Sequence, residues 1–139
     1  MDVRSYKDSD EEAVIALWNQ CGLVVPHNDP RKDIARKLAV GRDLFLVGEV
    51  NGEIVASVMG GYDGHRGWVN YLAVSPDHQR QRYGTVLMRA IEKTLLERGC
   101  PKLNLQIRRT NTAIIDFYNS IGYGEDSVVS MGKRLIPDH

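Results

Sequence analysis

The sequence predicts an α/β protein, of the α+β kind, in which about four helices flank a mixed and mostly antiparallel central sheet. Two apolar runs flank Asn51-Gly52, the residue pair most typical of a tight β-hairpin. Four other segments carry apolar residues at helical spacing and are bounded by capping residues, proline or glycine. A strand pattern lies directly before the longest of these segments, which indicates that strands and helices alternate in the second half of the chain.

The composition is that of an ordinary globular domain. The 139 residues are 42% hydrophobic and 26% charged, and no repeat or linker divides them, so residues 1–139 are expected to form one domain. A formal net charge of zero gives no support for a nucleic-acid or membrane-surface partner. Cys21 and Cys100 lack the spacing of a metal or redox site, and no signal peptide or membrane-spanning run is present. We therefore expect a cytoplasmic protein without a metal.

The first half of the chain predicts a short strand, two helices and the hairpin. Ser9-x-x-Glu12 matches a capping box and predicts the start of the first helix, which Gly22 ends. Asp29 is the expected cap of the second helix, because Pro30 follows it at the first helical position. The three strands of this half are expected at residues 3–6, 44–50 and 53–60.

The central part of the chain predicts a glycine-rich turn, a strand, a basic loop and a long helix. The turn covers residues 60–67 and leads into the strand at 68–74, which Pro76 ends because proline cannot continue a sheet ladder. The helix is expected to begin near Gly84 and to end at Gly99. A strand at 103–107, a helix from Asn111-Thr112 to Gly122 and a last strand at 128–135 complete the predicted fold.

The basic loop before the long helix is a candidate anion site. A helix start presents unpaired N–H groups and the positive end of the helix dipole, which together suit a phosphate or pyrophosphate. Arg80 and Arg82 add positive charge there, and residues 77–110 carry eight Lys or Arg against three Asp or Glu. The alternative is an ordinary strand-to-helix connection whose arginines face water.

Three motifs follow one another along the second half: Leu72-Ala73-Val74-x-Pro76, Gln79-Arg80-Gln81-x-x-Gly84, and Asn111 followed by Phe117-Tyr118 and Gly122-Tyr123. Taken together, they resemble those of the GNAT superfamily of acyl-CoA-dependent N-acetyltransferases, and the order of elements is similar over essentially the whole chain. Asn28-Asp29-Pro30, residues 60–67 and Gly99-Cys100-Pro101-Lys102 are similar to bacterial YpeA-type members.

This resemblance implies acetyl-CoA as the co-substrate, held between two strands that splay apart. The coenzyme contacts that it implies are Leu72, Ala73, Val74, Gln79, Arg80, Gln81, Arg82, Tyr83, Gly84, Thr85 and Asn111. Asn111 would contact the coenzyme or cap its helix. Tyr118 would be the general acid that donates a proton to the leaving thiolate, which is sensible chemistry for amine attack on a thioester. The alternative role for Tyr118 is that of a core aromatic beside Phe117.

Two positions depart from the family pattern. Glycine is usual where this chain has Arg82, so a side chain there either strains the loop or adds a phosphate contact. At Gln106, similar ribosomal-protein N-terminal acetylases have a Glu base, and glutamine cannot accept a proton at neutral pH. Asp63 and His65 in the glycine-rich turn are the remaining base candidates, although both residue types are also ordinary in turns and at surfaces.

The expected activity is therefore acetyl transfer to a small-molecule or peptide amine by direct attack in a ternary complex. Without a carboxylate base, an amine of low pKa is the preferred acceptor. The alternative is a CoA-binding sensor or partner-binding module that has lost turnover. An unrelated nucleotide binder is disfavoured because Gly-x-Gly-x-x-Gly and a Walker-type lysine are missing. A homodimer is also compatible with the sequence.

Overall fold

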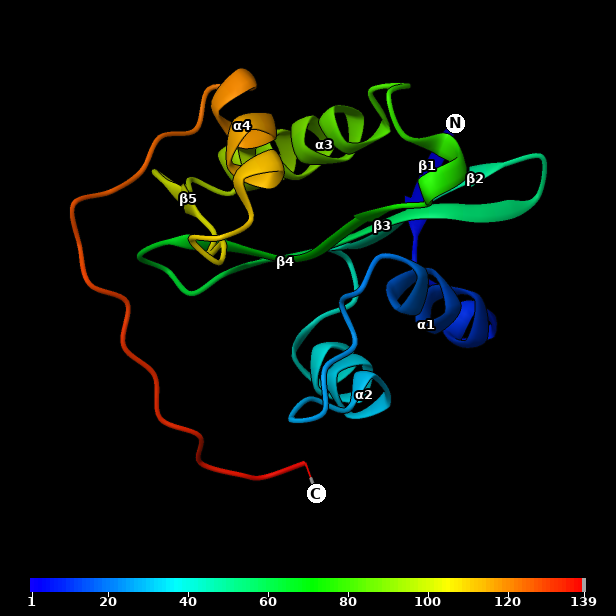
Figure 1. Ribbon diagram of the computed structural model, residues 1–139, viewed down its shortest axis with the longest axis horizontal. Coiled ribbons are helices and arrows are strands. Elements are labelled where there is room, and N and C mark those ends of the chain that lie inside the picture. Colours follow the sequence, from blue (N-terminus) through cyan, green and yellow to red (C-terminus); the bar gives the residue numbers. More distant parts are fainter. Residues whose placement is uncertain (139) are drawn as a thin grey trace.

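The computed structural model describes residues 1–138 and contains one five-stranded sheet with two helices on each face (Figure 1). The strands lie in chain order, with α1 and α2 on one face and α3 and α4 on the other. The strands are β1 (Asp2–Ser5), β2 (Phe45–Val50), β3 (Glu53–Tyr62), β4 (Gly67–Val74) and β5 (Leu103–Asn104). The helices are α1 (Glu11–Gln20), α2 (Pro30–Val40), α3 (Tyr83–Glu97) and α4 (Thr112–Ser120), with short 3-10 turns η1 (Asp8–Asp10) and η2 (Pro76–His78). Within residues 1–138, no helix is long and apolar enough to cross a membrane.

The sheet is antiparallel from β1 to β4 and parallel between β4 and β5. Asn51 and Gly52 form the β2–β3 turn with φ angles of 52° and 80°, the positive values that a two-residue hairpin of this twist requires. The predicted hairpin and the mixed, mostly antiparallel sheet are therefore confirmed.

Apolar side chains fill both layers between the sheet and its helices. On the α1/α2 side, Trp18 and Phe45 are both fully buried, and their rings stack 6.3 Å apart. On the α3/α4 side, Leu87, Met88 and Ile91 of α3 are fully buried. These three lie on one face of a helix, because residues three and four positions apart are neighbours there. The helices thus cover both faces of β3 and part of β4, where Trp68 and Asn70 stay exposed.

The start of α1 differs from the prediction, whereas the start of α2 agrees with it. Asp29 caps α2 by accepting hydrogen bonds from the backbone N–H groups of Arg31 and Lys32, at 2.9 and 3.4 Å. The helix α1 begins after Asp10 rather than at Ser9. The Asp10 carboxylate accepts from Lys7 N and from the Arg4 guanidinium, so a contact with β1 selects the residue at which the chain turns into the helix.

The predicted last strand at residues 128–135 is wrong, since the segment forms no strand, and β5 is shorter than expected. Val129, Met131 and Leu135 are 86%, 90% and 83% exposed. Asp138 anchors the far end of this segment at α2, where its carboxylate accepts from Asp29 N at 2.6 Å and from Arg36 at 2.8 Å. The segment therefore runs from α4 to α2 along the outside of the molecule, as Figure 1 shows, and its apolar residues pair with no strand of the sheet.

Candidate active site

The strands β4 and β5 part after their first two paired residues. Gly67 pairs with Leu103 and Trp68 pairs with Asn104, and there the pairing ends. Along the rest of β4 as far as Val74, the edge that faces β5 has no partner strand among the described residues. Backbone N–H and C=O groups on such an edge are available to a ligand wherever no side chain bonds to them, as Gln79 and Cys21 do to the Val74 carbonyl. This is the splayed arrangement that the resemblance of the sequence motifs implied.

A β-bulge changes the direction of the side chains along β4. Ser57 pairs with Ala73, but Met59 pairs with Asn70, so β4 has one residue more than β3 across this step. Tyr71 lies in the bulge with a φ of 53°, a left-handed conformation that is uncommon outside glycine. Beyond the bulge, Leu72 and Val74 face the α3 side, and Ala73 faces the α1/α2 side.

The loop before α3 ends in a helix start with open amide groups. Arg80 and Arg82 both have left-handed φ angles, 67° and 63°, and both side chains are exposed. Arg82 is the N-cap of α3 but makes no side-chain cap, and the first turn contains no acidic residue. The first-turn N–H groups of any helix lack an intrahelical acceptor, so this end of α3 presents donors and positive charge.

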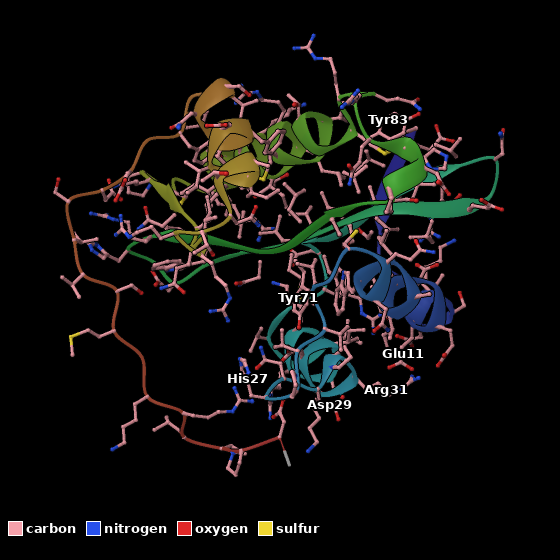
Figure 2. All side chains as sticks on the ribbon, in the orientation of Figure 1. Glu11, His27, Asp29, Arg31, Tyr71 and Tyr83 are labelled. Carbon is pink, nitrogen blue, oxygen red and sulfur yellow. The ribbon has the colours of Figure 1, made fainter. Side chains whose placement is uncertain are left out.

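Gly84 joins this helix start to the rest of the site. A Cβ atom at position 84 would lie 3.2 Å from the ring atom Cζ of Phe117 and 3.7 Å from Cγ2 of Val74. The start of α3, the helix α4 and the unpaired end of β4 therefore meet at this glycine. The loop also bonds to the strand, because the Gln79 side chain donates to the Val74 carbonyl at 3.3 Å. Figure 2 shows Tyr83 on this side of the sheet and Tyr71 on the opposite side.

Tyr118 lies on α4 in the core cluster between the sheet and α3 and is 6% exposed. Its ring packs edge-on against Phe117 at 5.0 Å and against Tyr123 at 5.5 Å. Burial raises the pKa of the Tyr118 phenol well above its ordinary value, so the hydroxyl keeps its proton at neutral pH. Within residues 1–138, this hydroxyl has no hydrogen-bond partner, which leaves it free to donate.

Asn111 and Gln106 lie beyond the end of β5, one at the start of α4 and the other before it. The Asn111 side chain caps α4 by accepting from Ile114 N at 3.4 Å, one of the two roles expected for it. Gln106 is exposed, and its side-chain amide donates to the Ser130 hydroxyl. Position 106 itself therefore supplies an amide rather than a carboxylate.

The two base candidates lie at the other end of β4. Asp63 and His65 are exposed in the β3–β4 turn, where the Asp63 carboxylate accepts from the backbone N–H groups of His65 and Arg66 at 2.8 and 2.7 Å. These two bonds hold the pKa of Asp63 below its ordinary value, which makes it a weaker base. From Gly67 to Leu72, the strand advances about 17 Å at 3.3–3.4 Å per residue. The structure therefore does not bring Asp63 and His65 to the end of β4 at residues 72–74, where the coenzyme contacts are expected.

Reasoning from the sequence missed the residues that support the bulge and the loop. The Ser57 hydroxyl links Trp18 to the backbone of Tyr71 on the α1/α2 side of the sheet. The positive φ of Tyr71 explains why the three residues meet. In η2, the buried Nδ1 atom of His78 has no hydrogen-bond partner within the described chain, and its ring stacks on Tyr83 at 6.3 Å. No signal in the sequence marks either group, because each depends on residues from separate elements.

Comparisons with known proteins agree with this fold. The sequence profile described as "Acetyltransferase (GNAT) family" matches residues 8–123. An acetyltransferase of Pectobacterium atrosepticum is 51% identical over 138 residues, which are 99% of this chain and 98% of that protein. The ribosomal-protein-S18-alanine N-acetyltransferase of Escherichia coli has a similar fold, with a TM-score of 0.75, 23% identity and coverage of 91% of this chain and 79% of that one. The PaiA N-acetyltransferase of Thermoplasma acidophilum, solved with coenzyme A, gives a TM-score of 0.77 at 15% identity and covers 92% of each chain.

Proposed function

Because the chain belongs to the GNAT family of acetyltransferases, we propose that it transfers the acetyl group of acetyl-CoA to an amine by direct attack in a ternary complex. Acetyl-CoA supplies the thioester that the amine attacks. The chain supplies the groups that bind the coenzyme, align the thioester and protonate the leaving sulfur.

The observation that carries this proposal is the meeting of three elements at Gly84. The residues proposed to hold the diphosphate are Gln79, Arg80, Gln81, Arg82, Tyr83, Gly84 and Thr85, at a helix start whose first turn has no acidic residue. Because Val74 lies near Gly84, a ligand anchored at this helix start can continue along the unpaired edge of β4 past Val74, Ala73 and Leu72. Open amides, positive charge and a continuous unpaired strand edge fit an extended, anionic thioester.

Tyr118 is the proposed general acid. Its helix also carries Phe117, which contacts the position of Gly84, so α4 is held against the proposed coenzyme site. The phenol is buried, protonated at neutral pH and without a hydrogen-bond partner within residues 1–138. A protonated group beside a leaving thiolate can neutralise it as the carbon–sulfur bond breaks.

The proposed acceptor is an amine of low pKa, because the site offers no carboxylate base at Gln106. An amine of pKa ~10.4 is neutral in about one molecule in 2,500 at pH 7, whereas an α-amine of pKa ~8 is neutral in about one in ten. The difference is about 3 kcal/mol in the free energy needed to reach the reactive form. Asp63 and His65 remain proposals for a base that acts through water, and their distance along β4 makes a direct role less favourable.

The test is an acceptor screen with acetyl-CoA that measures release of free thiol. We expect turnover with α-amines at neutral pH and little with lysine side chains. Tyr118→Phe should lower kcat at least tenfold while the Kd of CoA stays within about twofold, since the phenol acts on the leaving group. Tyr62→Phe is the matched control, because Tyr62 donates to Gly64 O in the β3–β4 turn, away from Gly84. An unchanged kcat in Tyr118→Phe would remove this residue from the mechanism.

A second candidate function is a CoA-binding module without turnover. Gln106 favours it, since a base is missing where similar enzymes have one. CoA binding by calorimetry, together with no thiol release for any amine in the screen, would identify this function.

A further inference from the structure

We propose that Ser57 is a positioning residue that holds the β4 bulge in the geometry that acyl transfer requires. The inference rests on the proposed function, because the bulge matters only if a thioester lies along the unpaired edge of β4. It assigns a role in catalysis to a serine on β3, the strand next to β4, whose side chain lies on the α1/α2 side of the sheet.

Ser57 is a polar residue in an apolar layer. It is fully buried on the α1/α2 side of the sheet. Its hydroxyl accepts a hydrogen bond from Trp18 Nε1 at 2.8 Å and donates one to the backbone carbonyl of Tyr71 at 2.9 Å. One hydroxyl therefore satisfies two buried groups, and the second of them is the carbonyl of the bulge itself. A buried serine with both bonds made is a fixed part of the structure, because either partner would otherwise be unsatisfied.

Tyr71 needs such support because its backbone is in an unfavourable conformation. A φ of 53° for a residue with a Cβ persists only where the surroundings determine it. The ring of Tyr71 stacks on Trp18 with centroids 3.8 Å apart, and its hydroxyl donates to the Asp33 carboxylate at 2.6 Å. These contacts fix the side chain. Ser57 is the residue whose side chain bonds to the Tyr71 carbonyl and so holds the peptide unit.

The bulge decides which way the following residues face. Val69, before the bulge, packs on the α3 side, whereas Ala73, four residues later, packs on the α1/α2 side. Side chains alternate with a period of two along a strand, so positions 69 and 73 would share a face in a regular strand. The bulge therefore turns Leu72 and Val74, and the backbone groups between them, into the orientation in which they meet the coenzyme site. If the Tyr71 peptide rotates, this alignment of the thioester is lost while the amides of α3 remain in place.

The experiment compares Ser57→Ala with Val47→Ala as a matched control. Val47 is fully buried on β2, lies directly opposite Ser57 in the register and packs in the same layer, yet it does not bond to Tyr71. Both substitutions loosen this layer, but only the first releases the bulge carbonyl. We expect Ser57→Ala to lower kcat about tenfold relative to Val47→Ala, with the Kd of CoA within about twofold of the wild-type value. The kcat and Kd values of all variants are measured well below the Tm of the least stable one.

Two further variants separate positioning from folding. Ser57→Thr keeps the hydroxyl, so its kcat should recover to within about threefold of the wild type. If Ser57→Ala does not fold, Trp18→Phe replaces it, because Trp18→Phe keeps an aromatic ring beside Tyr71 and removes the N–H that orients the hydroxyl, together with the five-membered ring of the indole. A severalfold loss of kcat at unchanged Kd of CoA in Trp18→Phe supports the proposal, and a kcat equal to that of Val47→Ala overturns it.

The outcomes also distinguish this inference from the proposed function. If the wild type releases thiol and Ser57→Ala matches Val47→Ala in kcat, or Ser57→Thr stays as low as Ser57→Ala, the positioning role is overturned and the proposed function stands. If the wild type neither binds CoA nor releases thiol with any amine, the proposed function itself fails.

Discussion

The N-termini of α2 and α3 present the same physical feature, a set of backbone N–H groups without intrahelical acceptors, but the chain treats them in opposite ways. At α2, the Asp29 carboxylate accepts from two of these groups, and the Asp138 carboxylate accepts from Asp29 N and lies beside Arg36. At α3, the cap residue is Arg82, which makes no side-chain cap, and no acidic residue lies in the first turn. The first end is closed by the protein's own anions, and the second is open to an external one.

The difference teaches how a helix start becomes a binding site rather than a structural joint. Every helix has the dipole and the free amides, so neither of them identifies a site. At α3, three additional features combine: two exposed arginines, a glycine that lets Phe117 approach, and a strand edge that β5 leaves unpaired. The proposed diphosphate site depends on that combination, and the following predictions test it from the largest expected effect to the smallest.

Gly84→Val should close the open end of α3. A Cβ at this position already lies 3.2 Å from Phe117, and the two further methyl groups of valine would push α3 away from α4 and from Val74. We expect CoA affinity, measured by calorimetry, to fall about 100-fold, equal to ~2.7 kcal/mol and within the range for overpacking. Gly132→Val is the control, because nothing lies within 4 Å of a Cβ there. An unchanged Kd in Gly84→Val would show that CoA binds elsewhere.

Asp29→Ala should remove the side-chain cap from the N-terminus of α2. Loss of the cap leaves the N–H groups of Arg31 and Lys32 without their carboxylate, which should lower the free energy of unfolding by about 1 kcal/mol. Denaturant unfolding measures this change. CoA affinity should stay within experimental error, and a parallel loss of CoA binding would contradict the division of roles between the two helix starts.

The contact of the Asp138 carboxylate with α2 should also weaken in acid. Hydrogen bonds from Asp29 N and Arg36 hold the pKa of the Asp138 carboxyl well below its ordinary value. A depressed folded-state pKa contributes stability that is present above the unfolded pKa of about 3.9 and is lost as pH falls toward the folded value. Relative to the wild type, Asp138→Asn should therefore lower Tm at neutral pH and show a smaller further decrease in Tm below about pH 4. Identical Tm profiles for the two proteins would show that this contact does not contribute.

Arg82→Gly should have the smallest effect. Its φ of 63° suits glycine, so the substitution removes backbone strain of about 1 kcal/mol, while the greater freedom of glycine in the unfolded chain offsets part of this gain. We expect a change in the free energy of unfolding of a few tenths of a kcal/mol in either direction. CoA affinity should fall only severalfold and more at low salt than at high salt, since one exposed charge is lost while the amides remain. A loss of 100-fold would mean that the Arg82 side chain, rather than the backbone, holds the phosphates.

Local signals in the sequence predicted most of the elements correctly. Asn51-Gly52 predicted the hairpin and Asp29-Pro30 the start of α2, because each rests on neighbouring residues whose backbone preferences act within one turn. The strand predicted at 128–135 failed for the opposite reason. Its residues have strand propensity, but a strand needs a partner edge, and the contact of Asp138 with α2 carries this segment elsewhere.

The sequence by itself determined the order of the elements as far as α4, the glycine at the start of α3 and the motif at residues 72–74, since these depend on the residue types at fixed spacings. Only the tertiary structure decided that β4 has a bulge at Tyr71, that the Ser57 hydroxyl bonds to the Tyr71 carbonyl and that Asp63 lies at the end of β4 opposite Val74. The physical reason is the separation of the partners along the chain. Trp18 meets Ser57 across 39 positions and Asp29 meets Asp138 across 109, and contacts of this kind follow from packing rather than from local preference.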